Sequence, residues 1–212
     1  MRINNYKPEE IEKKSFEIIS EELNKKDISL PTETANIIKR CIHTTADFDY
    51  VETLRFSPDA VNILKDLIKN GADIVTDTNM ALTGINKKEF LKYGGSINCY
   101  MADEDIVRLS KENETTRASE SMLKAMQSPR KTIFVCGNAP TALITLYEKY
   151  KKNEYVPAFI VGVPVGFVNV EAAKELIQNT EIPHIINEGR KGGSNVAAAI
   201  VNAVLYDMRN AK

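Results

Sequence analysis

The chain has 212 residues, of which 43% are hydrophobic and 27% are charged, and its formal net charge is −1. This composition is typical of a globular protein with a sizeable core, and the charge excludes general attraction to nucleic acid or to an anionic membrane. Neither a signal pattern nor a run of 18 apolar residues occurs. We therefore expect a cytoplasmic protein that does not bind or span a membrane.

The first 70 residues have helical patterns. Pro8 suits the start of a helix over residues 8–26, whose predicted common face is Ile11, Ser15, Ile18, Ile19 and Glu22. A second helix is predicted from near Pro31 to residues 43–45. A third is opened by Ser57 as N-cap and Pro58 as first helical residue, and it stops at Asn70-Gly71.

From residue 72 the pattern changes to apolar strands that alternate with helices. The predicted strands are 72–76, 96–101, 132–136, 158–163 and 182–186. This alternation predicts a five-stranded parallel sheet in a three-layer α/β/α fold, preceded by N-terminal helices. Residues 194–208 form an almost wholly apolar helix that we expect to be buried. We predict one domain over 1–212, with a helical N-terminal third to about residue 70.

Glycine-rich loops follow the last three predicted strands, at 137–143, 162–168 and 189–194. Ligands bind such sheets at the carboxyl ends of the strands, where glycine and free N–H groups at helix starts suit anionic groups. Arg190 and Lys191 add positive charge to the third loop. None of the loops matches the dinucleotide fingerprint or the P-loop, which counts against NAD and ATP. The loops therefore predict a crevice for another anionic ligand.

His43 is the best candidate for a group that moves a proton, because imidazole titrates near neutral pH. It is one of two histidines in the chain, and Arg40 precedes it by one helical turn. The C-terminal end of a helix favours its protonated form. Asp47 and Asp49 follow, and the sequence leaves open whether one orients His43 or both cap the next turn. His184, beside Pro183, is predicted to be structural.

Metal ligands and disulfides are not indicated. Cys41, Cys99 and Cys136 are scattered and odd in number, and no second pair of ligands at zinc-site spacing accompanies Cys41 and His43. Three other residues have two interpretations each. Arg117 is compatible with binding a ligand carboxylate or with an exposed ion pair. Asp77 and Met80 are compatible with a ligand site; alternatively, Asp77 caps a turn and Met80 is a core thioether.

Several strings of residues, in order along almost the whole chain, resemble the precorrin-8X/cobalt-precorrin-8 methylmutase family. They are Arg40-x-x-His43 with Asp47, Asp77-x-Asn79-Met80, Thr116-Arg117, Gly137-Asn-Ala-Pro-Thr-Ala-Leu143, Pro164-Val-Gly-Phe-Val168 and Gly189-Arg-Lys-Gly-Gly-Ser194. The strings over residues 138–143 and 164–168, in this order, are highly specific to that family. The residues around 50–56 and 103–114 are not distinctive, and nothing is carried over to them.

The resemblance implies an isomerase of cobalamin biosynthesis that moves a methyl group from C11 to C12 of a corrin-type macrocycle, giving hydrogenobyrinate or its cobalt form. It implies a flavodoxin-like fold, a homodimer, no cofactor and no protein-bound metal, with any cobalt carried by the substrate. His43 would be the proton donor or acceptor. Together with the loops, it predicts these substrate-binding residues: Ser15, Arg40, Asp77, Met80, Thr116, Arg117, Gly137, Asn138, Ala139, Thr141, Pro164, Gly166, Phe167, Arg190, Gly192, Gly193 and Ser194.

Two other functions fit the predicted crevice. One is a non-catalytic carrier of a corrinoid or tetrapyrrole, which would return the macrocycle unchanged. The other is an α/β enzyme that acts on an anionic sugar phosphate or nucleotide.

Overall fold

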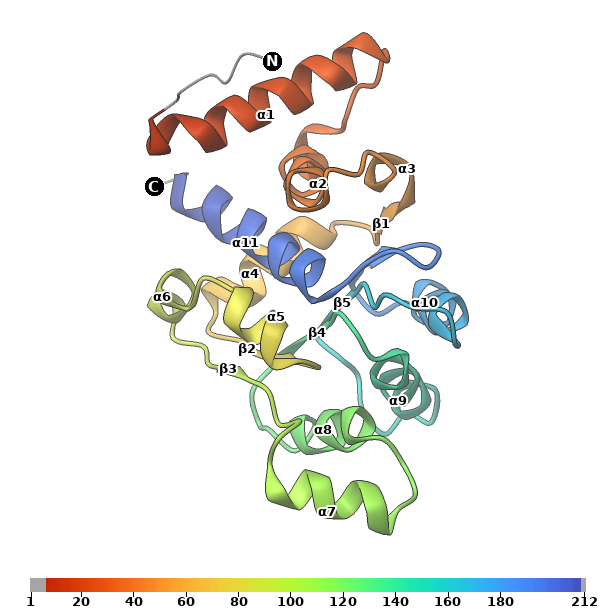
Figure 1. Ribbon diagram of the computed structural model, residues 1–212. Helices are drawn as coiled ribbons and strands as arrows, with labels where there is room; N and C mark the ends of the chain where they lie inside the picture. Colours follow the sequence, from red (N-terminus) through yellow and green to blue (C-terminus); the bar gives the residue numbers. More distant parts are fainter. Residues whose placement is uncertain (1–6, 211–212) are drawn as a thin grey trace.

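A six-stranded sheet runs through the centre of the computed structural model, which describes residues 7–210 (Figure 1). Its order is β1-β6-β5-β4-β2-β3, with β1 antiparallel to β6 and the other neighbours parallel. The bounds are β1 Leu54–Phe56, β2 Asp73–Thr76, β3 Ile97–Asn98, β4 Thr132–Cys136, β5 Phe159–Gly162 and β6 His184–Asn187.

The prediction of a five-stranded, all-parallel sheet is corrected by β1. This strand has three residues, too few to show an alternating pattern, and it lies at the edge beside β6. The helix that follows β1 also differs from the prediction. This helix, α4 (Ala60–Lys69), begins two residues later than predicted, after Asp59, whose φ is 57°. The Ser57 hydroxyl does not cap that helix but accepts the backbone N–H of His184 at 2.8 Å. The predicted strand 96–101 shortens to the two residues of β3.

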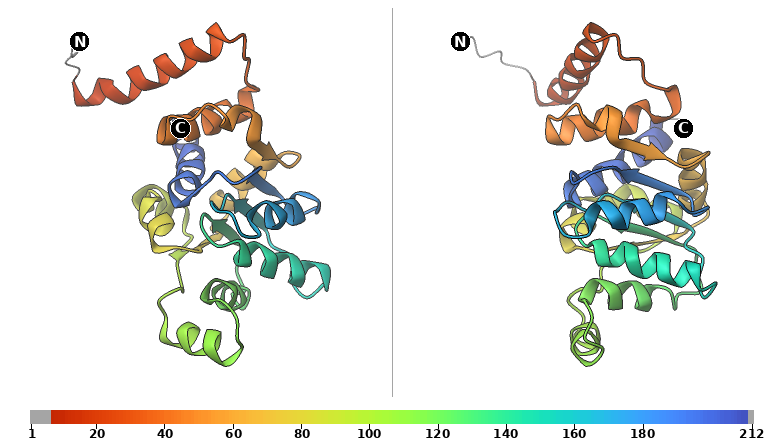
Figure 2. Two further views of the ribbon diagram at one scale, coloured as in Figure 1. Left: turned by 45° about the vertical axis from the view of Figure 1, so that its right-hand side comes forward. Right: turned by 90° about the vertical axis from the view of Figure 1, so that its right-hand side faces the viewer.

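Helices cover both faces of the sheet (Figures 1 and 2). Alternate strand residues separate the two cores: Ile133 and Val135 belong to one, Phe134 and Cys136 to the other. On the first face lie α4, α5 (Asn79–Gly84) and α11 (Ser194–Asn210); on the second lie α8 (Arg117–Ala125), α9 (Pro140–Lys151) and α10 (Val170–Gln178). Further helical segments are α3 (Tyr50–Thr53), α6 (Lys87–Phe90), η1 (Leu91–Tyr93) and α7 (Glu104–Glu112), the last packed on α8. None of the described helices is both long and apolar enough to cross a membrane.

The apolar helix α11 is buried, as predicted. It lies between the sheet and α2 (Thr32–Thr45), and α5 also packs against it. Its small residues allow this close packing, since a Cβ added at Gly84 would lie 2.8 Å from the Cβ of Ala198. Figure 1 shows α1 (Pro8–Lys25) stacked on the far side of α2, so the first helices form an extra layer on one face.

The predicted packing face of α1 is wrong in part. Ile11 is 52% exposed and Ile18 is 44% exposed, whereas Ile19 and Leu23 are buried. The helix has two apolar stripes, and the sequence alone does not say which one packs. The stripe against α2 is Phe16, Ile19 and Leu23, which leaves Ile11 and Ile18 on the outside.

Candidate active site

The carboxyl ends of β2 and β4 meet where the chain reverses its direction of winding across the parallel part of the sheet. Such a switch point is the usual ligand crevice of an open α/β sheet. Asp77 and Thr78 follow β2, and Gly137 and Asn138 follow β4. The structure therefore brings two of the predicted segments to one position at this rim.

Asp77 binds protein backbone at the switch point. Its carboxylate is fully buried and accepts the N–H groups of Gly137, Asn138 and Ala139 at 2.8, 2.7 and 2.6 Å. Burial raises the pKa of the Asp77 carboxyl, against the lowering effect of these three donors. The N–H groups in front of α9, which the sequence suggested for an anionic ligand, are therefore already occupied by Asp77. Its predicted contact with substrate stays a prediction.

The loops after β4, β5 and β6 pack tightly against one another. A Cβ added at Gly137 would lie 2.7 Å from the Cα of Ser194, and one at Gly192 would lie 2.1 Å from the carbonyl oxygen of Val163. Gly192 also has φ 149°, so it must be glycine for both reasons. The hydroxyls of Thr78 and Ser194 are 2.7 Å apart. The predicted glycine residues thus form one continuous rim.

The start of α8 joins this rim. Thr116 caps the helix by accepting the N–H of Ser119, and its hydroxyl lies 2.8 Å from that of Thr141 at the start of α9. Arg117 is exposed, and the one hydrogen bond of its guanidinium to a described residue is a long one of 3.4 Å to the carbonyl of Met101. Its guanidinium is therefore available for a carboxylate.

Apolar side chains project from the rim into solvent. Met80 is 70% exposed, Phe167 82% and Val168 76%. Arg190 lies over the Phe167 ring, with 5.6 Å between its guanidinium carbon and the ring centroid, and also pairs with Glu171 at 2.9 Å. Pro164, in contrast, is buried. Exposed apolar groups beside cations suit a ligand that has an apolar body and charged edges.

His43 lies in the last turn of α2, where its exposed ring stacks on Phe16 of α1 with 5.3 Å between ring centroids. The guanidinium carbon of Arg40 lies 4.5 Å from the centroid of the Phe16 ring. Arg40 also lies over the Tyr206 ring and pairs with Glu12. Ser15 is the neighbour of Phe16, and its hydroxyl donates to the Ile11 carbonyl. The predicted pair of Arg40 and His43 does share one face of the helix.

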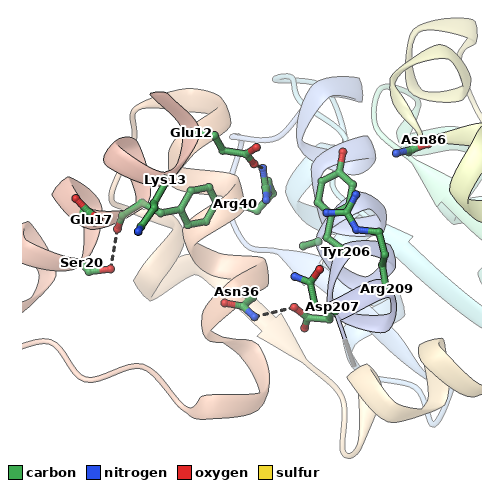
Figure 3. Close-up of a pocket in the computed structure, with 13 residues that line it drawn as sticks. Glu12, Lys13, Glu17, Ser20, Asn36, Arg40, Asn86, Tyr206, Asp207 and Arg209 are labelled. Carbon is green, nitrogen blue, oxygen red and sulfur yellow. Dashed lines mark hydrogen bonds and ion pairs between the residues drawn. The ribbon is translucent and has the colours of Figure 1, made fainter. Parts of the chain in front are cut away.

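A cavity of about 620 Å³ lies between α1, α2 and α11 (Figure 3). Arg40, Tyr206 and Arg209 are among its lining residues, and His43 is not. The Nε atom of Arg40 is buried and has no hydrogen-bond partner among the described residues.

Lys191 connects the helix that carries His43 to the glycine rim. Its ammonium donates to Asp47 at 2.6 Å and to Asp49 at 2.5 Å. The hydrogen bond from Lys191 lowers the pKa of Asp47, and both carboxylates raise the pKa of Lys191. The two aspartates, whose role the sequence left open, thus bind the loop after β6. The candidate site therefore has two parts, the rim and the surface around His43, joined by these ion pairs.

Lys174 of α10 is buried, with 1% of its surface exposed, and donates to the carbonyls of Gly189 and Lys191 at 2.7 and 2.8 Å. Burial lowers the pKa of its ammonium to about 8, a shift that the charge of Glu171 partly offsets. The sequence did not single out this residue, because a lysine on an amphipathic helix is ordinarily solvated. It also did not single out Phe16, although that aromatic is adjacent to Ser15.

The lowered pKa of Lys174 predicts a pH-dependent stability. Between about pH 8 and the ordinary pKa of 10.5, the unfolded chain binds more protons than the folded one. The free energy of unfolding of the wild type should therefore rise with pH relative to Lys174→Met, by about 3 kcal/mol across that window. Urea titrations of both proteins from pH 7.5 to 10.5 measure the difference in their free energies of unfolding. The contributions of the other titrating groups cancel in this difference. A flat difference would contradict the assignment.

The fold is that of an α/β protein with a close-packed, glycine-rich rim at the carboxyl ends of its parallel strands. The family model described as precorrin-8X methylmutase matches residues 10–207, and the chain belongs to this family of isomerases. It is 44% identical over 209 residues to the cobalt-precorrin-8 methylmutase of Salmonella typhimurium (strain LT2), covering 96% of this chain and 97% of that protein.

Other relatives agree. The cobalt-precorrin-8 methylmutase of Priestia megaterium is 41% identical, with 93% of this chain and 87% of that protein covered. The precorrin-8X methyl mutase structure from Thermus thermophilus superimposes with a TM-score of 0.85 at 32% identity, covering 95% of this chain and 98% of that one. The resemblance read from the sequence is therefore confirmed.

Proposed function

We propose that this protein moves a methyl group from C11 to C12 of precorrin-8 or cobalt-precorrin-8 in cobalamin biosynthesis, giving hydrogenobyrinate or its cobalt form. The observation that carries the proposal is the family match over residues 10–207. The exposed apolar side chains and cations at the rim support it, because the macrocycle has an apolar face and several carboxylate arms. No electron carrier is required, since the reaction is an isomerisation, and any cobalt belongs to the substrate.

In the proposed mechanism, His43 exchanges a proton with the macrocycle. The bond from the methyl group to C11 breaks as its bond to C12 forms, so the shift has no net oxidation or reduction. A proton supplied to the ring system near the migrating carbon favours the electron distribution of the product. The exposed ring of His43 supports this role, and the stack on Phe16 fixes its plane. Arg40, Arg117 and the rim loops are proposed to hold the carboxylates.

Arg117→Ala is expected to weaken substrate binding more than it slows the chemical step. The guanidinium is exposed and makes one long contact, so its removal should leave the fold intact and cost one carboxylate contact. We expect a ten- to hundredfold rise in KM with kcat within about threefold. Steady-state kinetics measure both, with the exposed Arg108 on α7, changed to alanine, as the control. A large fall in kcat at unchanged affinity would contradict the assignment.

Three further features belong to this proposal. The order of the five parallel strands, β3-β2-β4-β5-β6, supports a flavodoxin-like class, because it is the 2-1-3-4-5 order of that class. The exposed Ile11 and Ile18 beside Ser15 support a homodimer, which sedimentation would measure. A cytoplasmic location fits an enzyme of cobalamin biosynthesis.

The test of the proposed function is to mix the purified protein with precorrin-8 or its cobalt form and record the visible spectrum over time. Methyl migration changes the conjugated system, so a shift to the product spectrum is expected. A macrocycle that binds but keeps its spectrum would identify a carrier instead. Thermal stabilisation by sugar phosphates or nucleotides, with none by corrinoids, would indicate the third function.

A further inference from the structure

The loop after β6 has an unusual internal support. The carbonyl oxygens of Gly189 and Lys191 both point inward to the ammonium of Lys174, and the Lys191 carbonyl also accepts from the side chain of Asn187 at 2.9 Å. Figure 1 shows α10, which carries Lys174, beside the loop that leads into α11. Asn187 is fully buried. Two buried side chains therefore fix the orientation of these peptide groups from beneath.

The inward carbonyls determine where the N–H groups of the same peptides point. In a trans peptide the C=O of one residue and the N–H of the next lie on opposite sides of the chain. The N–H groups of Arg190 and Gly192 therefore point away from Lys174. Neither N–H has a hydrogen-bond acceptor within residues 7–210. The loop thus presents two free donors on its outer side, next to the guanidinium of Arg190.

The hydrogen bonds from Lys174 to the two loop carbonyls, called the clamp below, require burial of an ammonium group, which costs free energy. This cost argues that the orientation of the loop matters. A buried ammonium loses its hydration, as the lowered pKa of Lys174 shows, and a surface loop ordinarily satisfies its carbonyls with water at no such cost. The same loop holds Asp47 and Asp49 through the side chain of Lys191. Lys174 therefore fixes the backbone of a segment that is tied to Asp47, four residues beyond His43, and to Asp49.

We propose that Lys174 is a positioning residue that turns the loop after β6 so that the N–H groups of Arg190 and Gly192 bind a carboxylate of the substrate. The inference rests on the proposed function for the identity of that substrate. Lys174 itself does not touch the ligand. Its contribution is to hold two backbone donors in a fixed direction, which lowers the entropic cost of binding a carboxylate arm.

Lys174→Met tests the proposal, because methionine retains the apolar length of the side chain and removes the donors. Without the clamp the two peptides can rotate, and KM is expected to rise ten- to hundredfold with kcat within about threefold of the wild type. Lys174→Arg restores donors to both carbonyls and should bring KM back to within about fivefold. Ile177→Ala, a buried change on the same helix, controls for general destabilisation and should leave KM unchanged.

Amide NMR of the folded protein gives an independent readout. Addition of the corrin product that carries all its carboxylates should shift the Arg190 and Gly192 N–H signals of the wild type. The same corrin with its side chains chemically amidated should shift them much less, as should the acid form with Lys174→Met.

An unchanged KM in folded Lys174→Met, or no shift of these two signals in the wild type, would overturn the proposal. If Lys174→Met fails to fold, the wild-type titration alone decides. If the wild type does not convert precorrin-8 yet its two amides respond to the corrin carboxylates, the proposed function fails and the positioning role stands.

Discussion

Replacement of His43 by alanine is expected to lower kcat by about a hundred- to ten-thousandfold, the range typical of general acid–base catalysis. The ring is exposed at the end of α2 and stacks on Phe16 without a hydrogen bond to another described residue. Its loss should therefore have little effect on folding. Steady-state assays of methyl migration, with circular dichroism to check the fold, provide the measurement.

His43→Gln is the matched variant, because glutamine keeps a polar side chain of similar length that does not exchange protons near neutral pH. It should be as slow as the alanine variant, and both should bind the corrin product within a few-fold of the wild type. If either variant retained turnover within a few-fold of the wild type, His43 would not be the proton donor or acceptor.

Asp77→Ala should be the most destabilising single change at the rim. It removes the acceptor of three backbone N–H groups from a position with no exposed surface. We expect a loss of about 3 to 5 kcal/mol in the free energy of unfolding, because buried donors without partners each cost about 1 to 3 kcal/mol and some will be rehydrated. Urea titration at pH 7 measures the loss.

Asp66→Ala is the control, since that aspartate is exposed on α4 and its carboxylate forms an exposed ion pair with Lys69. Its effect should stay within about 0.5 kcal/mol. The loss in the free energy of unfolding for Asp77→Asn should lie between those of Asp77→Ala and Asp66→Ala. The amide keeps one acceptor oxygen but turns an N–H₂ group toward a backbone donor. A small effect of Asp77→Ala would mean that the loop after β4 satisfies its N–H groups in another way.

Most of the fold could be predicted because its signals are local. The helix boundaries near Pro31 and Asn70-Gly71 follow from start and stop signals in the sequence, and the parallel strands follow from continuous apolar runs. Two features could not be predicted. The strand β1 exists because β6 offers it an edge, and the packing stripe of α1 is chosen by α2. Both depend on partners distant in sequence.

The site was predictable to the extent that it depends on residue types at strand ends. Those residues do gather at one rim, and Arg40 and His43 share a face. Contacts between distant side chains and backbone were not predictable. Nothing in the sequence indicates that the Asp77 carboxylate accepts the N–H groups in front of α9. Nor does it indicate that Lys174 donates to carbonyls 15 and 17 residues further along the chain.

The two edge strands limit how this protein can associate with itself. A long, flat edge would offer free N–H and C=O groups to a strand of another molecule, and so would invite pairing or aggregation. Here β1 has three residues and β3 has two. Neither is long enough to be a template for a neighbouring chain, so sheet extension between molecules is disfavoured. A contact through the outward stripe of α1 would instead bury the exposed side chains of Ile11 and Ile18 without pairing strands.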